Sequence, residues 1–158
     1  MKGNDKIIAT LNDLLSDELT AVNQYMVHSE MCNNWGYDRL HQVMEKRAID
    51  EMKHAEKLIA RILFLEGLPN VSEYGAIHIG ADVAAQIGND LKAEQGAVKV
   101  YNKAIKQAQE LGDNGSRELF DSILKDEEDH LDWLEAQNDQ IKHMGIQLYL
   151  AEQLKEGK

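Results

Sequence analysis

Glycine residues and one proline divide the chain into a few long segments, and this division constrains the fold more than any other feature. The breaks fall at Gly36, Gly67 with Pro69, Gly75, Gly80, Gly112 with Gly115, and Gly145. The segments between them predict four helices of about thirty residues each. We expect these over residues 5–35, 37–66, 82–111 and 116–144, with a short fifth helix over 146–154. Ser116 is the expected N-cap of the fourth helix, and Gly145 is its expected stop.

Composition agrees with an all-α chain. There are two Phe, runs of β-branched residues are few, and the helix formers Ala, Leu, Glu, Lys and Gln are abundant. With 158 residues and 43% hydrophobic residues, we expect one domain over residues 1–158 with a single good core.

The lengths of the breaks predict how the helices connect. Gly36 leaves room only for a tight antiparallel hairpin, whereas the stretch 67–81 is longer than neighbouring antiparallel helices need. Two hairpins joined by one long crossover is the ferritin-like form of the four-helix bundle.

Charge and cysteine content limit the class of protein. Seventeen basic residues against 28 acidic ones give a formal charge of −11, which argues against a nucleic-acid partner. The N-terminal residues carry no long apolar stretch, so we expect no signal peptide and no membrane association. The single cysteine, Cys32, cannot form an internal disulfide, which favours a cytoplasmic, reducing location.

A glutamate interrupts the apolar stripe near the middle of each long segment. Burying even one bare carboxylate costs several kcal/mol, so four of them facing one another require cations between them. Two of the segments add a histidine three residues after the glutamate, which puts both side chains on one helix face. Oxygen-rich sites with one imidazole per metal suit iron or manganese. The residues concerned are Glu18, Glu51, His54, Glu94, Glu127 and His130.

An internal repeat supports a shared centre over the alternative, which is a set of solvated helix faces. Glu18 and Glu94, Glu51 and Glu127, and His54 and His130 all stand 76 positions apart, as do Tyr25 and Tyr101 and also Asp50 and Asp126. The repeat predicts a pseudo-symmetric two-metal centre. The other histidines lack this pattern, and we expect them to be ordinary surface or cap residues: His28, His41, His78 and His143.

Over essentially its whole length the chain resembles the bacterioferritins. The resemblance rests on the runs 50–55, 62–69, 126–130 and 132–135 and on Met144-Gly145. It implies a hollow octahedral cage, a 24-mer with a mineral core, a ferroxidase centre in each subunit and haem b between two-fold related subunits. It also implies that Glu18 and Glu94 are terminal ligands and that Glu51 and Glu127 are bridging ligands, with His54 and His130 supplying the imidazoles and Tyr25 hydrogen-bonding a ligating carboxylate.

Met52 matches the methionine that binds the haem iron axially in that family. One residue past Glu51 it turns about 100° away from the bundle core, so it should point outward. Its expected neighbours form a second apolar stripe: Leu19, Asn23, Met26, Ala48, Ile49 and Glu56. The alternative is that Met52 packs in a dimer interface without haem. Two positions differ from members of the family: Lys46 stands where some members have a histidine that serves with Asp50 in an inner iron site, and Glu45 stands where one member has an aromatic residue.

These observations predict iron storage and detoxification with ferroxidase activity. Fe(II) would be oxidised by oxygen or hydrogen peroxide, and a ferredoxin-type reductant would release the stored iron. The ligand set alone leaves two alternatives open, a soluble di-iron or di-manganese redox enzyme such as a peroxidase or catalase-like protein, and a haem-free ferritin.

Overall fold

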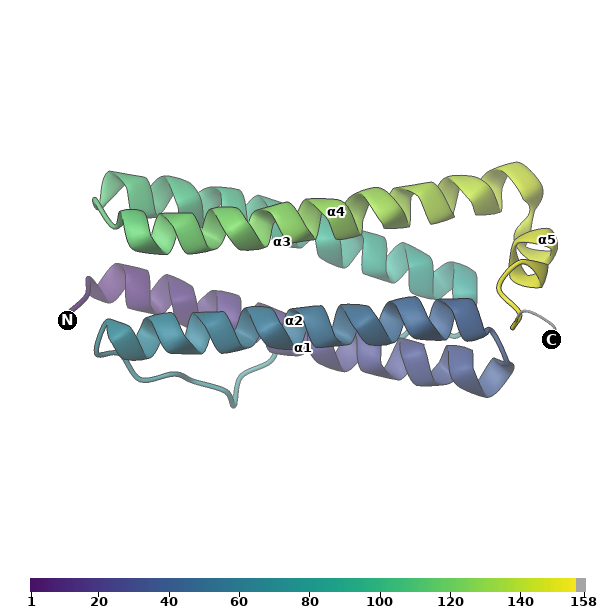
Figure 1. Ribbon diagram of the computed structural model, residues 1–158, viewed down its shortest axis with the longest axis horizontal. Helices are drawn as coiled ribbons and strands as arrows, with labels where there is room; N and C mark the ends of the chain where they lie inside the picture. Colours follow the sequence, from purple (N-terminus) through teal and green to yellow (C-terminus); the bar gives the residue numbers. More distant parts are fainter. Residues whose placement is uncertain (156–158) are drawn as a thin grey trace.

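The computed structural model describes residues 1–155 and consists of two helical hairpins lying side by side (Figure 1). The first hairpin pairs α1 (Asp5–Trp35) with α2 (Asp38–Phe64), and the second pairs α3 (Val83–Glu110) with α4 (Asn114–Met144). A short α5 (Ile146–Ala151) closes one end, and the described residues contain no strand. The predicted all-α bundle with one long crossover and a short fifth helix is confirmed.

The helix ends follow most of the expected signals. Gly36 adopts a left-handed φ of 83° and turns the chain directly from α1 into α2. Gly145 ends α4 as predicted, whereas α5 ends at Ala151, three residues before the expected boundary.

The N-cap prediction for α4 was wrong. The cap is Asp113, whose side chain accepts a hydrogen bond from the Ser116 backbone N–H at 2.9 Å, and Ser116 lies inside the first turn. A carboxylate here also binds Arg61 of α2 at 2.7 Å, which gives Asp113 a second stabilising contact that local sequence does not reveal.

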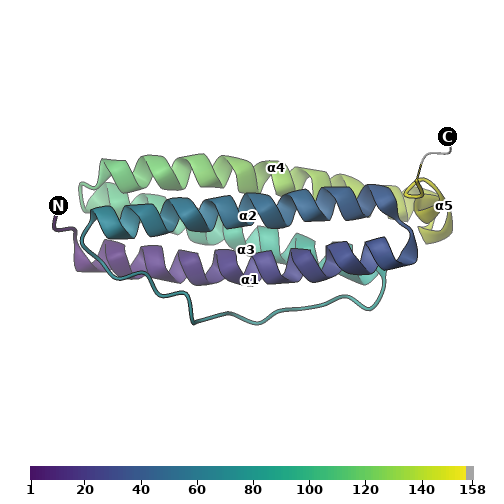
Figure 2. The same ribbon diagram turned by 60° about the horizontal axis from the view of Figure 1, so that its bottom comes forward.

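The crossover runs along the whole bundle beside α1 (Figure 2). Side chains at every fourth position of α1 hydrogen-bond its backbone at 2.8–3.2 Å. Because residues four apart share one helix face, these side chains form a ladder that fixes an otherwise irregular segment. The rungs are Asn12, Ser16, Thr20, Gln24 and His28.

The apolar core is divided into two clusters. One includes Leu11, Ile62 and Phe120, and the other includes Leu40, Ile87 and Tyr149 near α5. Buried acidic and imidazole side chains belong to neither cluster, although the helices that carry them run through both. Within residues 1–155 no helix combines the length and hydropathy needed to cross a lipid bilayer.

Candidate metal centre

The structure brings the six predicted ligands together inside the bundle. Each of the four long helices contributes one glutamate, and α2 and α4 each add the histidine one turn later. Their side chains are almost completely inaccessible, with exposed fractions of 1–3%.

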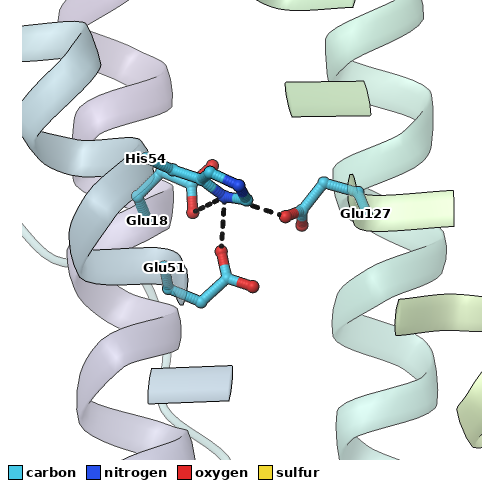
Figure 3. A group of neighbouring side chains, drawn as sticks. All are labelled: Glu18, Glu51, His54 and Glu127. Carbon is cyan, nitrogen blue, oxygen red and sulfur yellow. Dashed lines mark hydrogen bonds and ion pairs between the residues drawn. The ribbon is translucent and has the colours of Figure 1, made fainter. Parts of the chain in front are cut away.

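Both imidazoles turn the same nitrogen toward the carboxylates. His54 Nδ1 lies 3.1 Å from Glu127, 3.2 Å from Glu51 and 3.6 Å from Glu18 (Figure 3). His130 Nδ1 lies 3.0 Å from Glu51, 3.5 Å from Glu94 and 3.8 Å from Glu127. The two rings are nearly parallel, with centroids 6.2 Å apart.

The six residues form two overlapping groups, each with its ligand atoms within 4.8 Å of one another. Glu18 and His54 belong to the first group, and Glu94 and His130 belong to the second. Glu51 and Glu127 belong to both, so their position is the one that bridging carboxylates would occupy.

Several buried polar atoms of this cluster are not in hydrogen-bonding geometry with any partner, although some of them lie within ion-pair distance of one another. They are Glu51 Oε1, Glu94 Oε2, Glu127 Oε1 and His130 Nδ1. Because leaving such atoms unpaired is costly, and because oxygen and imidazole donors bind iron and manganese, this donor set fits two divalent cations.

Without cations, protons compensate the buried charge. Burial, together with the nearby charge of Glu51, raises the pKa values of Glu18 and Glu127 well above the ordinary range. Burial also opposes ionisation of Glu51, but its contacts with Glu18 and with both imidazoles hold its pKa below the usual value. Although burial disfavours the imidazolium of His130, the neighbouring carboxylates of Glu51 and Glu94 raise its pKa to about 9. The pKa of His54 is likewise raised by its three carboxylate neighbours against the effect of burial.

Two aspartates contact the outer nitrogens of the imidazoles, and in each case the aspartate and the histidine belong to different hairpins. Asp126 lies 3.0 Å from His54 Nε2, and Asp50 lies 3.4 Å from His130 Nε2. Such carboxylate–imidazole contacts fix the ring orientation and make the inner nitrogen a better ligand. The 76-residue repeat marks both aspartates, but it does not reveal what they contact.

Two buried tyrosines donate hydrogen bonds to the two glutamates that belong to only one ligand group each. The Tyr25 hydroxyl donates to Glu94 Oε1, which places Tyr25 beside the centre, and the Tyr101 hydroxyl donates to Glu18 Oε1. Each hydrogen bond joins α1 to α3, so it links the two hairpins. Sequence analysis assigned no role to Tyr101 beyond its place in the repeat.

A cavity of about 600 Å³ lies between α1 and α3. Its lining includes Glu18, Glu94 and Glu127 together with Tyr25 and Tyr101. Small residues of α3, Ala93, Gly96 and Ala97, and crossover residues such as Gly75 line the rest. The candidate centre is therefore approached from the side where the two tyrosines lie.

Met52 lies away from the centre, on the exposed surface of α2, as its helix position predicts. Its side chain is 42% exposed, and two apolar side chains that the sequence places in the same stripe, Met26 of α1 and Ile49 of α2, are 49% and 47% exposed. Lys46 forms an ion pair with Asp50 at 2.9 Å, so a lysine ammonium stands where the resemblance suggested an inner-surface metal site. Glu45 contacts His41 at 3.5 Å.

The prediction that His28 is an ordinary surface or cap residue was wrong. His28 is completely buried, its Nδ1 lies 3.0 Å from Asp90, and its Nε2 accepts a hydrogen bond from the Gly80 backbone. Gln24 also donates to Asp90, at 2.8 Å. His41 is half-buried against Ser29, whereas His78 and His143 are exposed as predicted.

Comparisons with known proteins agree with this geometry. Residues 8–144 match the model of the ferritin family, described as a ferritin-like domain. The chain is 44% identical over 149 residues to a bacterioferritin of Brucella melitensis, covering 94% of this chain and 92% of that protein. It is 41% identical over 147 residues to a bacterioferritin of Rhodobacter capsulatus, covering 93% and 91%. It is 38% identical over 152 residues to bacterioferritin BfrA of Mycobacterium tuberculosis, covering 96% of both chains.

Proposed function

Because the chain belongs to the bacterioferritin family of ferritin-like proteins, we propose that it stores iron and acts as a ferroxidase. Its substrate is Fe(II), its oxidant is oxygen or hydrogen peroxide, and its product is a ferric mineral held inside a protein cage. The observation that carries this proposal is the pair of overlapping ligand groups that share Glu51 and Glu127. One Fe(II) would bind Glu18 and His54, the other would bind Glu94 and His130, and the shared glutamates would bridge them.

The reaction needs two electrons, and two Fe(II) ions supply them together. Oxygen and two protons give hydrogen peroxide, while hydrogen peroxide and two protons give two waters, and each iron becomes Fe(III). The four carboxylates favour the ferric pair because hard oxygen ligands stabilise the more highly charged ion. Metal binding also displaces the protons held at the empty centre, since carboxylates and imidazoles bind metals in their deprotonated forms.

The cage requires contacts between copies of this chain, and the surface of the monomer offers apolar side chains for them. Leu63 and Phe64 at the end of α2 are 58% and 52% exposed, and Leu68 of the crossover is 85% exposed. Leu63 and Phe64 are adjacent in the chain, and contiguous exposed apolar surface is typical of protein interfaces. We propose an assembly of one type of chain. The buried free thiol of Cys32 favours a reducing, cytoplasmic location for it.

The proposal predicts that iron uptake exceeds the capacity of the centre. Metal-free protein is titrated with Fe(II) in air while ferric absorbance and soluble iron are followed. Oxidation should continue well beyond two ions per chain, with the iron retained in solution. Saturation at two ions followed by precipitation would contradict storage, and would favour a di-iron redox enzyme instead.

Haem b is the cofactor that the family implies, and the surface around Met52 fits it. Met52 is exposed, and Ile49, which precedes it by one turn of α2, is exposed as well, so an apolar porphyrin would find apolar contacts there. A two-fold axis would supply a second methionine from the neighbouring chain. The two Met52 side chains would hold the haem iron, and the bound group would supply one-electron transfer between a ferredoxin-type reductant and stored ferric iron.

Replacing Met52 by leucine is therefore expected to abolish haem binding. Leucine keeps the volume and apolar character but removes the sulfur ligand, so a dimer contact would survive the change. The visible absorption of protein reconstituted with haem measures the result, with Met26→Leu as the control. Haem bound equally well by the Met52 variant would show that this surface is only a protein interface. Parent protein that binds no haem would indicate a haem-free ferritin.

A further inference from the structure

Tyr101 occupies the same position in the second hairpin that Tyr25 occupies in the first. Tyr25 extends from α1 to Glu94 on α3, and Tyr101 extends from α3 to Glu18 on α1. Both tyrosines are buried, with exposed fractions of 3% and 1%. The two hydrogen bonds are thus related by the pseudo-two-fold symmetry that relates the two ligand groups.

The surroundings of Tyr101 fix where its hydroxyl lies. Its ring belongs to the core cluster around Leu11 and Ile62 and packs against Phe120, with centroids 6.4 Å apart. The cavity between α1 and α3 is lined by Tyr101 and by three of the glutamates, Glu18, Glu94 and Glu127. An open space cannot hold a carboxylate in place, so a hydrogen bond from a rigid ring supplies the restraint that packing does not.

The two carboxylate oxygens of Glu18 have different neighbours. Oε1 accepts from Tyr101, whereas Oε2 lies 3.6 Å from His54 Nδ1, on the side of the other ligands. The second group differs: Glu94 Oε1 accepts from Tyr25 and also lies 3.5 Å from His130 Nδ1, while Oε2 has no hydrogen-bond partner.

We propose that Tyr101 is a positioning residue that holds Glu18 as a one-oxygen ligand of the metal beside His54. This inference rests on the proposed function, because it assumes that the two ligand groups bind metal. It predicts a division of labour: Tyr101 supports the metal bound by Glu18, and Tyr25 supports the metal bound by Glu94. Loss of one hydroxyl should therefore lower the affinity for one metal ion of the pair far more than the affinity for the other.

The experiment is an anaerobic titration of metal-free protein with Co²⁺, followed by visible absorption. Tyr101→Phe keeps the ring and its contact with Phe120 but removes the donor. We expect one Co²⁺ per chain to bind about 10- to 100-fold more weakly and the other to bind as in the parent. Tyr149→Phe is the matched control, since Tyr149 is also buried and donates to Gln137 at 2.7 Å, away from the centre.

A double-mutant cycle identifies which metal is affected. Tyr101→Phe should have little further effect in a Glu18→Gln background, because the ligand it supports is already lost, but its full effect in a Glu94→Gln background. Replacing Tyr101 by fluorotyrosine keeps the hydroxyl as a stronger donor, so Co²⁺ affinity should be at least that of the parent. This second variant also provides a test if the phenylalanine variant does not fold.

The outcomes separate the inference from the proposed function. If Tyr101→Phe binds two Co²⁺ ions with the affinity of the parent, or if fluorotyrosine weakens binding, the positioning role is overturned and the proposed function stands. If the parent itself binds no Co²⁺ at the centre, the proposed function and the positioning role both fail.

Discussion

Replacing Glu51 and Glu127 together by glutamine should slow Fe(II) oxidation by more than about 100-fold, because it removes the two carboxylates shared by both ligand groups. Glutamine has nearly the same shape but carries no charge, so it can neither bridge two cations well nor neutralise them. The measurement is the initial rate of ferric absorbance after Fe(II) is mixed with aerobic, metal-free protein.

The same variant provides an internal check on folding. Removing the Glu51 charge takes away a carboxylate partner of both imidazoles, so the metal-free variant should unfold at a lower temperature than the parent while keeping its helical content. Glu56→Gln with Glu128→Gln is the matched control, since both residues lie on the same two helices but are exposed. Oxidation at the parent's rate in the Glu51 and Glu127 variant would indicate a structural bundle whose glutamates have no role in iron chemistry.

The metal-free protein should become less stable as the pH rises from about 6.5 to 9. Over this range His130, whose folded-state pKa is about 9, keeps a proton that the unfolded chain has already lost. The raised pKa values of Glu18, Glu127 and His54 act in the same direction. Because the folded state then binds more protons than the unfolded state, the free energy of unfolding falls as the pH rises.

Urea unfolding at a series of pH values measures this dependence. Protein loaded with a divalent metal serves as the control, because its ligands are already deprotonated and the bound ions compensate the carboxylates. Its stability should exceed that of the metal-free form, and the difference should widen toward pH 9. A metal-free stability that stays level or rises between pH 6.5 and 9 would contradict the protonated centre.

The fold could be predicted from the sequence because helix ends and loop lengths are marked by local residue patterns. Glycines mark the ends of the long helices, and the length of the crossover distinguishes this topology from a simple up-and-down bundle. The N-cap of α4 was missed because Asp113 and Ser116 are both good caps, and the choice between them involves Arg61, which is 52 residues from Asp113.

The candidate site could be predicted because it repeats. The 76-residue offset identified six residues that the structure brings together, and such agreement does not depend on exact helix boundaries. By contrast, His28 and its partner Asp90 lie 62 positions apart and outside any repeat. For Tyr101, helix periodicity places the ring in the core but cannot say which carboxylate its hydroxyl reaches.

The ladder along α1 changes how the long connection between hairpins should be treated in protein engineering. Long loops without secondary structure are the usual choice for grafting a foreign peptide, since extra length there costs little. Here the backbone of Asn70, Gly75 and Gly80 is held by side chains spaced along α1, so added residues would shift every later rung. The turn around Gly112 is exposed and joins α3 to α4 directly, so we expect it to tolerate an insertion better than the crossover does.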